Sequence, residues 1–351
     1  MTVQAIRQPH EQSVENGVSY PFVEAVTTYI RMEDGERSEE GMYIPSLDAN
    51  SIRCATRNHR HRAAFWRGFA SSEDDWKHST IPKADGSTRP ISEPGDWGKD
   101  CGEYIAARIW KSFQPFQEVG FAPGTGSPVA LEELQWHMSR NRDVVALDIK
   151  GAFNALSAKQ VFDLMKAAGA STEVARIAVR SCCSGGRMMM GATLSPALFA
   201  LAMYEVSQQI LSVFGNQVGQ VLAYADDLYL IPFEGVDVNR LKKQVRFLLW
   251  QVMKFKLSTG KSQWYRSHLG ARALGASIST DGRIRPRPKM RSRIRGLQHH
   301  YDQLRGGDEF HSSSKHLRTD DDKLPNVHMA LMGYRHWERS LRRVSRPSSS
   351  V

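Results

Sequence analysis

The sequence predicts a mixed α+β protein built from two or three packed subdomains. Several segments space their apolar residues at helical intervals, and several short apolar runs bounded by turn residues are typical of strands. The chain has 351 residues, of which 41% are hydrophobic. A chain of this length and composition can fill more than one hydrophobic core, because single cores stop growing at about this size.

The charge balance indicates a polyanionic partner. Lys and Arg number 47 against 37 acidic residues, which gives a formal net charge of +10. Such an excess attracts polyanions at a distance and neutralises phosphates on contact, so nucleic acid is the natural partner. A basic surface with no ligand would give the same balance, so motifs must decide between the two.

The cysteines and the apolar runs indicate the compartment. Cys54, Cys101, Cys182 and Cys183 show no CxxC spacing, and adjacent cysteines cannot form an ordinary bridge without strain. This usage fits a reducing cytoplasm. The N-terminus has no apolar signal core, and no stretch reaches the roughly 18 apolar residues of a membrane helix. We therefore expect a cytoplasmic protein with no membrane partner.

The first half of the chain gives three clear elements after residue 80. Residues 81–94 read as a hairpin around a DG turn, because their prolines forbid a helix. Residues 101–116 have helical spacing that Pro115 ends. VVALDI, residues 144–149, is a short apolar run that suits a buried strand and places Asp148 at its carboxyl end. A helix over residues 158–170 follows, with Gly169 near its end.

The second half alternates long helices with a hairpin. A strongly apolar helix is predicted from Ser195-Pro196 to residue 214, with the proline where a first helical turn accepts it. QVLAYADDLYLIPF, residues 220–233, predicts a hairpin whose tip is YADD. Residues 238–255 predict an amphipathic helix over the sheet. A dense basic run occupies residues 283–295, and residues 328–343 predict a last amphipathic helix.

The carboxylates at two strand ends carry the chemistry. If the strand ending at Asp148 lies beside the YADD hairpin, Asp148, Asp226 and Asp227 converge into a cluster whose repulsion only metal ions offset. Mg²⁺ binds a few carboxylate oxygens, several waters and substrate phosphates, which is the arrangement of two-metal phosphoryl transfer. Asp226 and Asp227 could instead simply cap a surface turn, although the apolar strands on both sides favour a buried hairpin.

Taken in order, several motifs resemble those of bacterial reverse transcriptases of the group II intron, retron and defence-associated kind. IPKADGSTRPI resembles the fingers motif, VVALDIKGAFNAL the first metal motif, MGATLSPALFALAM the template-groove motif and YADD the second metal motif. GFAPGTGSPVAL, STGKSQ and LGASI resemble further segments of the family. The resemblance covers roughly residues 80–300. It implies a right-hand polymerase with fingers, a palm that carries the YADD hairpin on an antiparallel sheet, and a helical thumb.

The resemblance also implies roles for individual residues. Asp148, Asp226 and Asp227 would be ligands of two Mg²⁺ ions, or of Mn²⁺, with the Ile149 carbonyl as a helper. Lys261 would protonate the departing pyrophosphate. The residues expected to contact the incoming nucleotide are Lys83, Arg89, Phe153, Met190 and Gly191, with Phe153 excluding a ribose 2′-hydroxyl. Arg291, Arg293 and Arg295 of the basic run would contact the phosphates of the duplex.

The chain departs from the family pattern at the template groove. Met190 stands where the family usually has Gln, and Ala122 and Thr125 stand where it has arginines. The sequence lacks the extensions of intron enzymes, the NAxxH and VTG signatures of retrons, and the SQ ending of diversity-generating enzymes. By elimination it resembles a stand-alone or defence-associated enzyme.

These observations lead to one preferred function and two alternatives. The preferred function is an RNA-directed DNA polymerase that binds an RNA template, a DNA product and dNTPs, in antiviral defence, with a non-coding RNA or a second subunit as further partners. An RNA-dependent RNA polymerase or a template-independent nucleotidyl transferase would keep the same palm. A nucleic-acid-binding protein without activity would not require the acidic triad. We expect an N-terminal extension that packs on the fingers, then fingers and palm, then a basic helical thumb and C-terminal tail, over residues 1–80, 81–280 and 281–351.

Overall fold

In the computed structural model the chain forms two compact units. The first unit combines Met1–Gly124 with Leu147–Ser262, and the second combines Thr125–Ala146 with Gln263–Val351. The predicted boundaries at residues 80 and 280 concern functional subdomains and stay a prediction. The structure describes residues 14–15, 18–19, 47–56, 58–82, 88–113, 119–120, 127–258, 260–281, 283–306, 332, 335, 337–339 and 341.

The YADD turn lies at one end of the strands of a sheet in the first unit. Within the first unit the strand order is β6-β10-β9-β5, to which β6 contributes its last residues, Leu147 and Asp148, and β10 runs antiparallel to β9 while β5 runs parallel to it. Buried apolar residues dominate β9 and β10, as the pattern of residues 220–233 predicted. The strands are β5 (Val119–Gly120), β6 (Val144–Asp148), β9 (Val218–Tyr224) and β10 (Asp227–Pro232).

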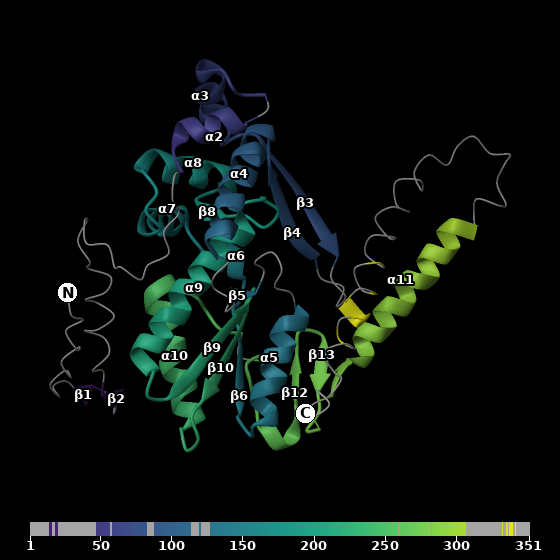
Figure 1. Ribbon diagram of the computed structural model, residues 1–351. Helices are drawn as coiled ribbons and strands as arrows, with labels where there is room; N and C mark the ends of the chain where they lie inside the picture. The colour runs from purple at the N-terminus through teal and green to yellow at the C-terminus, as the bar shows by residue number, and fades with distance from the viewer. Residues whose placement is uncertain are drawn as a thin grey trace, which may run out of the picture. The chain divides into compact units, whose positions relative to one another are not determined.

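Two long helices pack together beside the β9–β10 hairpin, and Figure 1 shows them side by side. They are α9 (Ser195–Phe214), which contacts β9, and α10 (Val238–Met253), which contacts α9. Pro196 lies in the first turn of α9, where its missing N–H costs nothing. Asp237 caps α10, because its side chain accepts from the backbone N–H groups of Asn239 and Arg240.

The apolar helix α9 is buried, although its length and composition would also suit a membrane span. Its most apolar 18-residue window has a mean hydropathy of 1.3. The expectation that the chain has no apolar stretch long enough for a membrane helix was therefore wrong. Of that window, 72% is buried inside the protein, as in the core helix of a globular protein. Among the described residues it is the single helix of this kind.

Further helices complete the first unit, and local capping explains where they begin. The Ser157 hydroxyl and the Gln160 side chain form a capping box at the start of α7, and Gln160 also donates to the Met253 carbonyl at 2.8 Å, which ties α7 to the end of α10. These elements are α4 (Asp96–Phe113), α6 (Ala152–Ala155), α7 (Ala158–Ala167), α8 (Thr172–Cys182), β7 (Cys183–Ser184) and β8 (Arg187–Met188).

The hairpin predicted over residues 81–94 is confirmed and begins earlier than predicted. Strands β3 (Trp76–Pro82) and β4 (Thr88–Pro94) pair antiparallel from Trp76 opposite Pro94 to Pro82 opposite Thr88. Its DG turn lies outside the described residues. The backbone N–H of Ser92 donates to the Met190 carbonyl at 2.7 Å, so this hairpin is attached to the segment that precedes α9.

The N-terminal part of the first unit includes two helices that contact α4. They are α2 (Ala49–Ala55) and α3 (Arg62–Ser71). Phe65 of α3 is fully buried, with its ring 5.5 Å from the ring of Trp97 in α4. The short strands β1 (Val14–Glu15) and β2 (Val18–Ser19) pair with each other. The predicted packing of residues 1–80 on the fingers stays a prediction.

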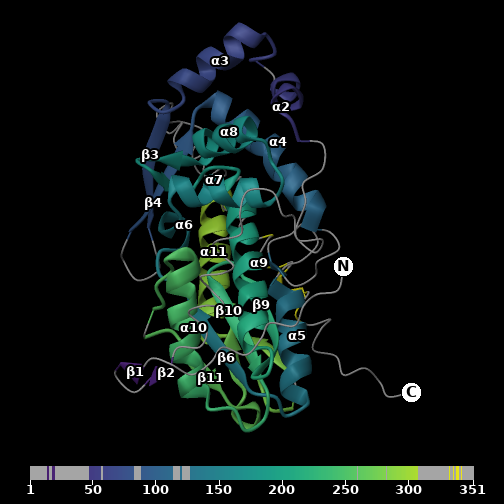
Figure 2. The same cartoon turned by 90° about the vertical axis from the view of Figure 1, so that its left-hand side faces the viewer.

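The second unit contains small strands and two long helices. Strand β11 pairs antiparallel with the first residues of β6, and β12, β13 and β14 form a separate sheet. The basic run 283–295 contributes both β14 and the start of α11, because Pro288 begins a new helix. Figure 2 draws α11 as one continuous yellow-green helix. The elements are α5 (Ser127–Ser139), β11 (Gln263–Tyr265), η1 (Ser267–Leu269), β12 (Ala271–Ala273), β13 (Ala276–Ile278), β14 (Ile284–Pro286) and α11 (Pro288–Gly306).

Candidate active site

The YADD turn places two carboxylates beside the end of β6. Tyr224 pairs with Asp227, so Ala225 and Asp226 form a two-residue loop between β9 and β10. Ala225 has φ +55°, which costs a non-glycine residue roughly 1–2 kcal/mol. The Ile149 backbone N–H donates to the Asp226 carbonyl at 2.9 Å, which brings the residue after Asp148 against the turn.

A segment after α10 fixes Asp148 from the other side. Ile149 and Leu257 form an antiparallel bridge, in which Lys150 donates to the Lys256 carbonyl and Ser258 donates to the Asp148 carbonyl. Neither bond uses the Ile149 carbonyl, which stays available for the role predicted from the sequence. The chain then turns, and the Lys261 ammonium lies 3.1 Å from Asp148 Oδ1.

The electrostatics of the three carboxylates show that they act on one another. Burial and, to a lesser extent, the nearby Asp226 and Asp148 charges together raise the pKa of Asp227 to about 7, while Lys261 opposes the shift. Burial also raises the pKa of Asp226, with Asp148 adding to the shift and Lys261 and Arg89 opposing it. Asp148, Asp226 and Asp227 therefore lie close enough for their charges to interact, and their role as metal ligands stays a prediction.

The donor set fits a hard divalent cation. A cation would offset both the burial and the mutual repulsion that raise the pKa values of Asp226 and Asp227. In the described part of the chain, no group of three or more His, Cys, Asp or Glu residues encloses a metal position by itself. Mg²⁺ does not need such a cage, because it typically takes one or two carboxylates and completes its shell with water and substrate phosphates.

Phe153 lies on a support of aromatic rings. Its ring is 5.1 Å from the ring of Phe199 in α9, and the Phe199 ring is 5.8 Å from that of Phe255. Phe199 and Phe255 are fully buried, whereas Phe153 is half-buried. The Phe153 ring is thus packed against Phe199 on one side, while part of the side chain remains exposed and can contact a ligand.

Met190 and Gly191 lie against the hairpin β3–β4. Gly191 has φ +113°, and a Cβ atom there would lie 2.5 Å from Ile91 Cγ2 and 2.9 Å from the Ser92 carbonyl oxygen. Only glycine allows β4 to come this close. Met190 is half-buried, and its carbonyl accepts from Ser92. The structure shows a structural reason for Gly191, and the predicted nucleotide contact of both residues stays a prediction.

The remaining predicted site residues fall into two groups. Arg89 is exposed on β4 and close enough to lower the pKa of Asp226, and its predicted contact with the nucleotide stays a prediction. Lys83, Ala122 and Thr125 lie outside the described residues. Arg291 and Arg295 are exposed on α11. Arg293 lies in the same helix, in the second unit.

Sequence reasoning missed several parts of this arrangement. The attachment of Ser92 to Met190 and the bridge between Ile149 and Leu257 are made by backbone atoms, which leave no residue-type signal. The support of Phe153 by Phe199 could have been found, because Phe199 lies in a helix predicted to be buried on most sides.

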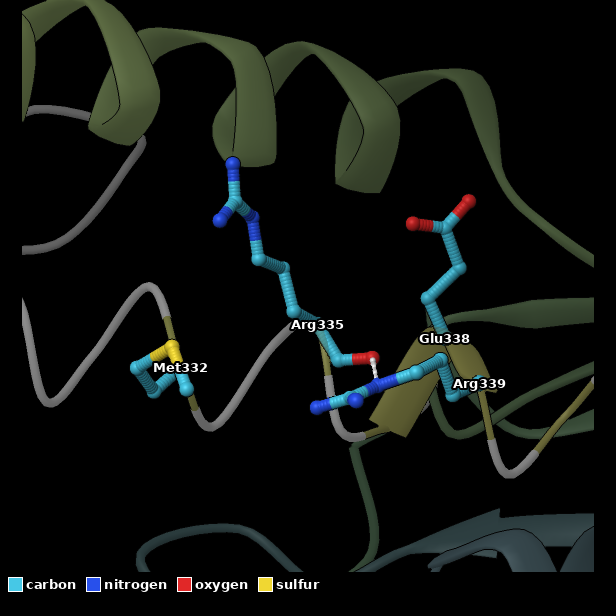
Figure 3. Close-up of a pocket in the computed structure, with 4 residues that line it drawn as sticks. All are labelled: Met332, Arg335, Glu338 and Arg339. Carbon is cyan, nitrogen blue, oxygen red and sulfur yellow. Dashed lines mark hydrogen bonds between the residues drawn. The ribbon is translucent and has the colours of Figure 1, made fainter.

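A pocket of about 330 Å³ elsewhere is no rival to this site. Met332, Arg335, Glu338 and Arg339 line it (Figure 3). In Figure 3 the Arg335 side chain points toward α11, where it bonds to Gln298, and Arg339 donates to the Arg335 carbonyl at 3.3 Å. Glu338 is the single carboxylate among these four residues, so they form no cluster of acidic side chains.

Comparison with known proteins places this geometry in a family. Residues 81–278 match the family model described as reverse transcriptase (RNA-dependent DNA polymerase). No curated protein matches the chain. Among solved structures, the chain is similar to apo telomerase from Candida tropicalis truncated from the C-terminal domain, at 10% identity and a TM-score of 0.43. That match covers 60% of this chain and 54% of the telomerase chain.

A second solved structure gives a similar result. Telomerase from Candida albicans, in complex with a TWJ fragment of telomeric RNA, matches at 12% identity and a TM-score of 0.43, over 77% of this chain and 56% of that one. The chain thus spans a little over half the length of these structures. The family match covers more than half of the chain, including β9, β10 and all three carboxylates, and the fold is an α+β right-hand polymerase. The chain therefore belongs to the reverse transcriptase family, whose members are RNA-directed DNA polymerases and use divalent metal ions.

Proposed function

We propose that the chain is an RNA-directed DNA polymerase that adds dNTPs to a primer 3′-hydroxyl with the help of two Mg²⁺ ions, which Mn²⁺ could replace. One observation carries the proposal: the backbone at the end of β6 is hydrogen-bonded to the YADD turn, which brings Asp148 close to Asp226 and Asp227. When bound, the cations would activate the 3′-hydroxyl and neutralise the triphosphate. Asp148, Asp226 and Asp227 would hold them, with the Ile149 carbonyl as a further oxygen ligand.

The other residues of the site supply binding and proton transfer. Arg89, exposed on β4 and within electrostatic reach of Asp226, suits a bidentate grip on the triphosphate. Lys261 lies 3.1 Å from Asp148 Oδ1, and 71% of its side chain is exposed, so its ammonium can reach a phosphate and donate a proton to the departing pyrophosphate. Phe153, supported by Phe199, presents its ring where bulk would exclude a ribose 2′-hydroxyl.

Met190 favours one alternative chemistry. A half-buried thioether cannot donate or accept hydrogen bonds as the usual Gln does, so template contacts at this position are weaker. The same palm could then add ribonucleotides on an RNA template, or nucleotides without a template.

The experiment is primer extension on a defined RNA template with either dNTPs or rNTPs, followed by sequencing of the product. The proposal predicts a product that is complementary to the template, made from dNTPs and digested by DNase. A product made from rNTPs, or one unrelated to the template, would instead support the alternative chemistry.

We further propose that the enzyme acts in the cytoplasm in defence against phage. Support comes from the resemblance to stand-alone and defence-associated reverse transcriptases and is therefore associational. Phage would be plated on cells that carry the native locus or a locus with Asp226→Ala and Asp227→Ala. The proposal predicts more plaques on the variant cells, and equal plaque counts across a broad phage panel would contradict it.

A further inference from the structure

The exposed face of α10 carries an aromatic side chain among cations. Lys243, Arg246 and Trp250 fall within about 60° of one another around the helix, since α-helices have 3.6 residues per turn. All three are exposed, and Trp250 is 42% exposed. The opposite face packs inward through Leu241, Val245, Leu248 and Leu249. This face is therefore not needed for the core.

Two further lysines extend this face beyond the end of the helix. Lys254 has φ +56° and ends α10, and its Nζ lies 5.6 Å from the centre of the Trp250 ring. The Lys256 Nζ lies 5.4 Å from the same centre. We call Lys243, Arg246, Trp250, Lys254 and Lys256 the α10 stripe. From Lys243 to Lys254 it extends about 16 Å, at 1.5 Å per residue.

The α10 stripe has no acidic counterpart. The sequence contains no Asp or Glu between Asp237 and the end of the segment at Lys261. Within the described residues, none of the four cations forms an ion pair with a carboxylate. Unpaired cations around an exposed tryptophan suit a ligand that offers both negative charge and flat rings.

The last residue of the α10 stripe is hydrogen-bonded through its backbone to the segment that follows Asp148. The Lys256 carbonyl accepts from the Lys150 backbone N–H at 2.7 Å, and Lys150 is two residues after Asp148. The backbone segment that carries Lys256 therefore lies next to the segment that carries Asp148. Single-stranded nucleic acid combines phosphates for the cations with bases that stack on an aromatic ring whatever their sequence.

We propose that the α10 stripe binds a single-stranded segment of the RNA template outside the catalytic site, with a base stacked on Trp250. The inference rests on the proposed polymerase function for the identity of the strand. Recognition is sequence-tolerant, because phosphates and ring faces carry little sequence information. An acidic protein is the rival occupant, since it would satisfy the same cations.

The test is binding of a fluorescent single-stranded RNA of about twelve nucleotides, measured by anisotropy without nucleotides. Trp250→Ala should weaken binding roughly 5- to 150-fold, the loss expected from removing one base–aromatic stack. Trp250→Phe should restore most of the affinity. Trp136→Ala is the matched control, because Trp136 is 41% exposed on α5 and also lies under an arginine. It should bind like the wild type.

The cations give an independent measurement. Replacing Lys243, Lys254 and Lys256 with Gln should reduce the slope of log affinity against log salt by about 2, at about 0.7 per lost phosphate contact on a single strand. Addition of one nucleotide to a primer with a one-base template overhang should be unchanged, whereas the KM for a long single-stranded template should rise. The binding measurement needs no catalysis, so its failure is distinct from failure of the polymerase proposal.

Three results would overturn the proposal. Wild-type binding by Trp250→Ala is the first, and equal loss in Trp136→Ala is the second, because it would show a nonspecific effect. The third is an acidic peptide of about twelve glutamates that binds as tightly as the RNA and loses the same affinity in Trp250→Ala. That result would assign the stripe to an acidic protein.

Discussion

The aromatic rings packed around Phe153 restrict the movement of its side chain. Its ring rests on Phe199, and Phe199 in turn faces Phe255, so the ring cannot retreat when a nucleotide approaches. A close-packed interior yields little to a ligand. The bulk of Phe153 is therefore available to discriminate between sugars.

Phe153→Val should admit ribonucleotides, because the smaller side chain leaves room for a 2′-hydroxyl. The measurement is the ratio of rNTP to dNTP incorporation, which should rise by one or more orders of magnitude. Phe153→Tyr keeps the bulk of the ring and should keep the wild-type ratio. An unchanged ratio in Phe153→Val would remove Phe153 from the sugar site.

Asp227 makes the stability of the metal-free protein depend on pH. Its folded pKa of about 7 lies above the ordinary value of 3.8, so between these values the folded state binds more protons than the unfolded state. Stability therefore falls as pH rises through this window, and the loss is complete above the folded pKa. Asp227→Asn should remove that loss.

The check on Asp227 is urea unfolding of both proteins in a chelator. The Asn variant should gain stability relative to the wild type as the pH rises from about 4 to about 8. A difference between the two proteins that does not change with pH would contradict the raised pKa. Adding Mg²⁺ should stabilise the wild type more than the variant.

At the scale of elements, the sequence predicted most of what its local patterns encode. The hairpin at YADD, the apolar helix α9 and the amphipathic helix α10 all follow from periodicity and turn residues. The order of strands in the sheet does not, because it depends on pairing between distant segments. Strand β5, only two residues long, gave no detectable pattern.

The basic run at residues 283–295 shows the same limit. Its charges predicted an exposed surface, and Arg291 and Arg295 are exposed. Its division into β14 and α11 depends on Ile284, which is buried in the pairing of β14 with β13. One apolar residue among many cations was too little signal to predict that strand.

The contact between β4 and Gly191 can be tested by a substitution that adds one methyl group at position 191. Gly191→Ala should destabilise the protein by roughly 1–3 kcal/mol, because the new Cβ would overlap Ile91 and the Ser92 carbonyl. Gly185→Ala is the control: its φ is +56°, but nothing lies within 4 Å of the added atom. Gly185→Ala should lose only the part of the unfolding free energy that comes from placing a side chain at a positive φ.

The two variants are compared by their urea unfolding midpoints. Gly191→Ala should unfold at a clearly lower concentration than Gly185→Ala, and it should also impair nucleotide addition if Arg89 of β4 grips the triphosphate. Equal midpoints for the two variants would mean that β4 does not approach Gly191 as closely as described.

At the scale of the whole molecule, function requires the nucleic acid to remain bound while nucleotides are added. Arg291 and Arg295 are exposed on α11, in the unit that does not contain the carboxylates. The sequence assigned them to phosphate contacts. Such contacts hold a duplex in place without reading its bases.

Neutralising Arg291, Arg293 and Arg295 together should weaken primer–template binding uniformly across sequences. The salt dependence of binding should flatten by about 0.9 log units per lost contact if the product is duplex DNA. Addition of a single nucleotide at saturating primer–template should change much less than processivity, since the carboxylates are untouched. Unchanged binding and an unchanged salt slope would assign these arginines to solvent or to a protein partner.

Nucleotide addition should depend on Asp148, Asp226 and Asp227 acting as one catalytic site. The decisive measurement is single-turnover primer extension with the Asp226→Ala/Asp227→Ala variant. Removing two half-buried carboxylates that repel each other should leave the metal-free fold at least as stable as the wild type. The variant should therefore unfold normally in urea and still bind primer–template. It should add no nucleotide above background, whereas addition at the wild-type rate by the folded variant would show that these carboxylates do not hold the catalytic metal ions.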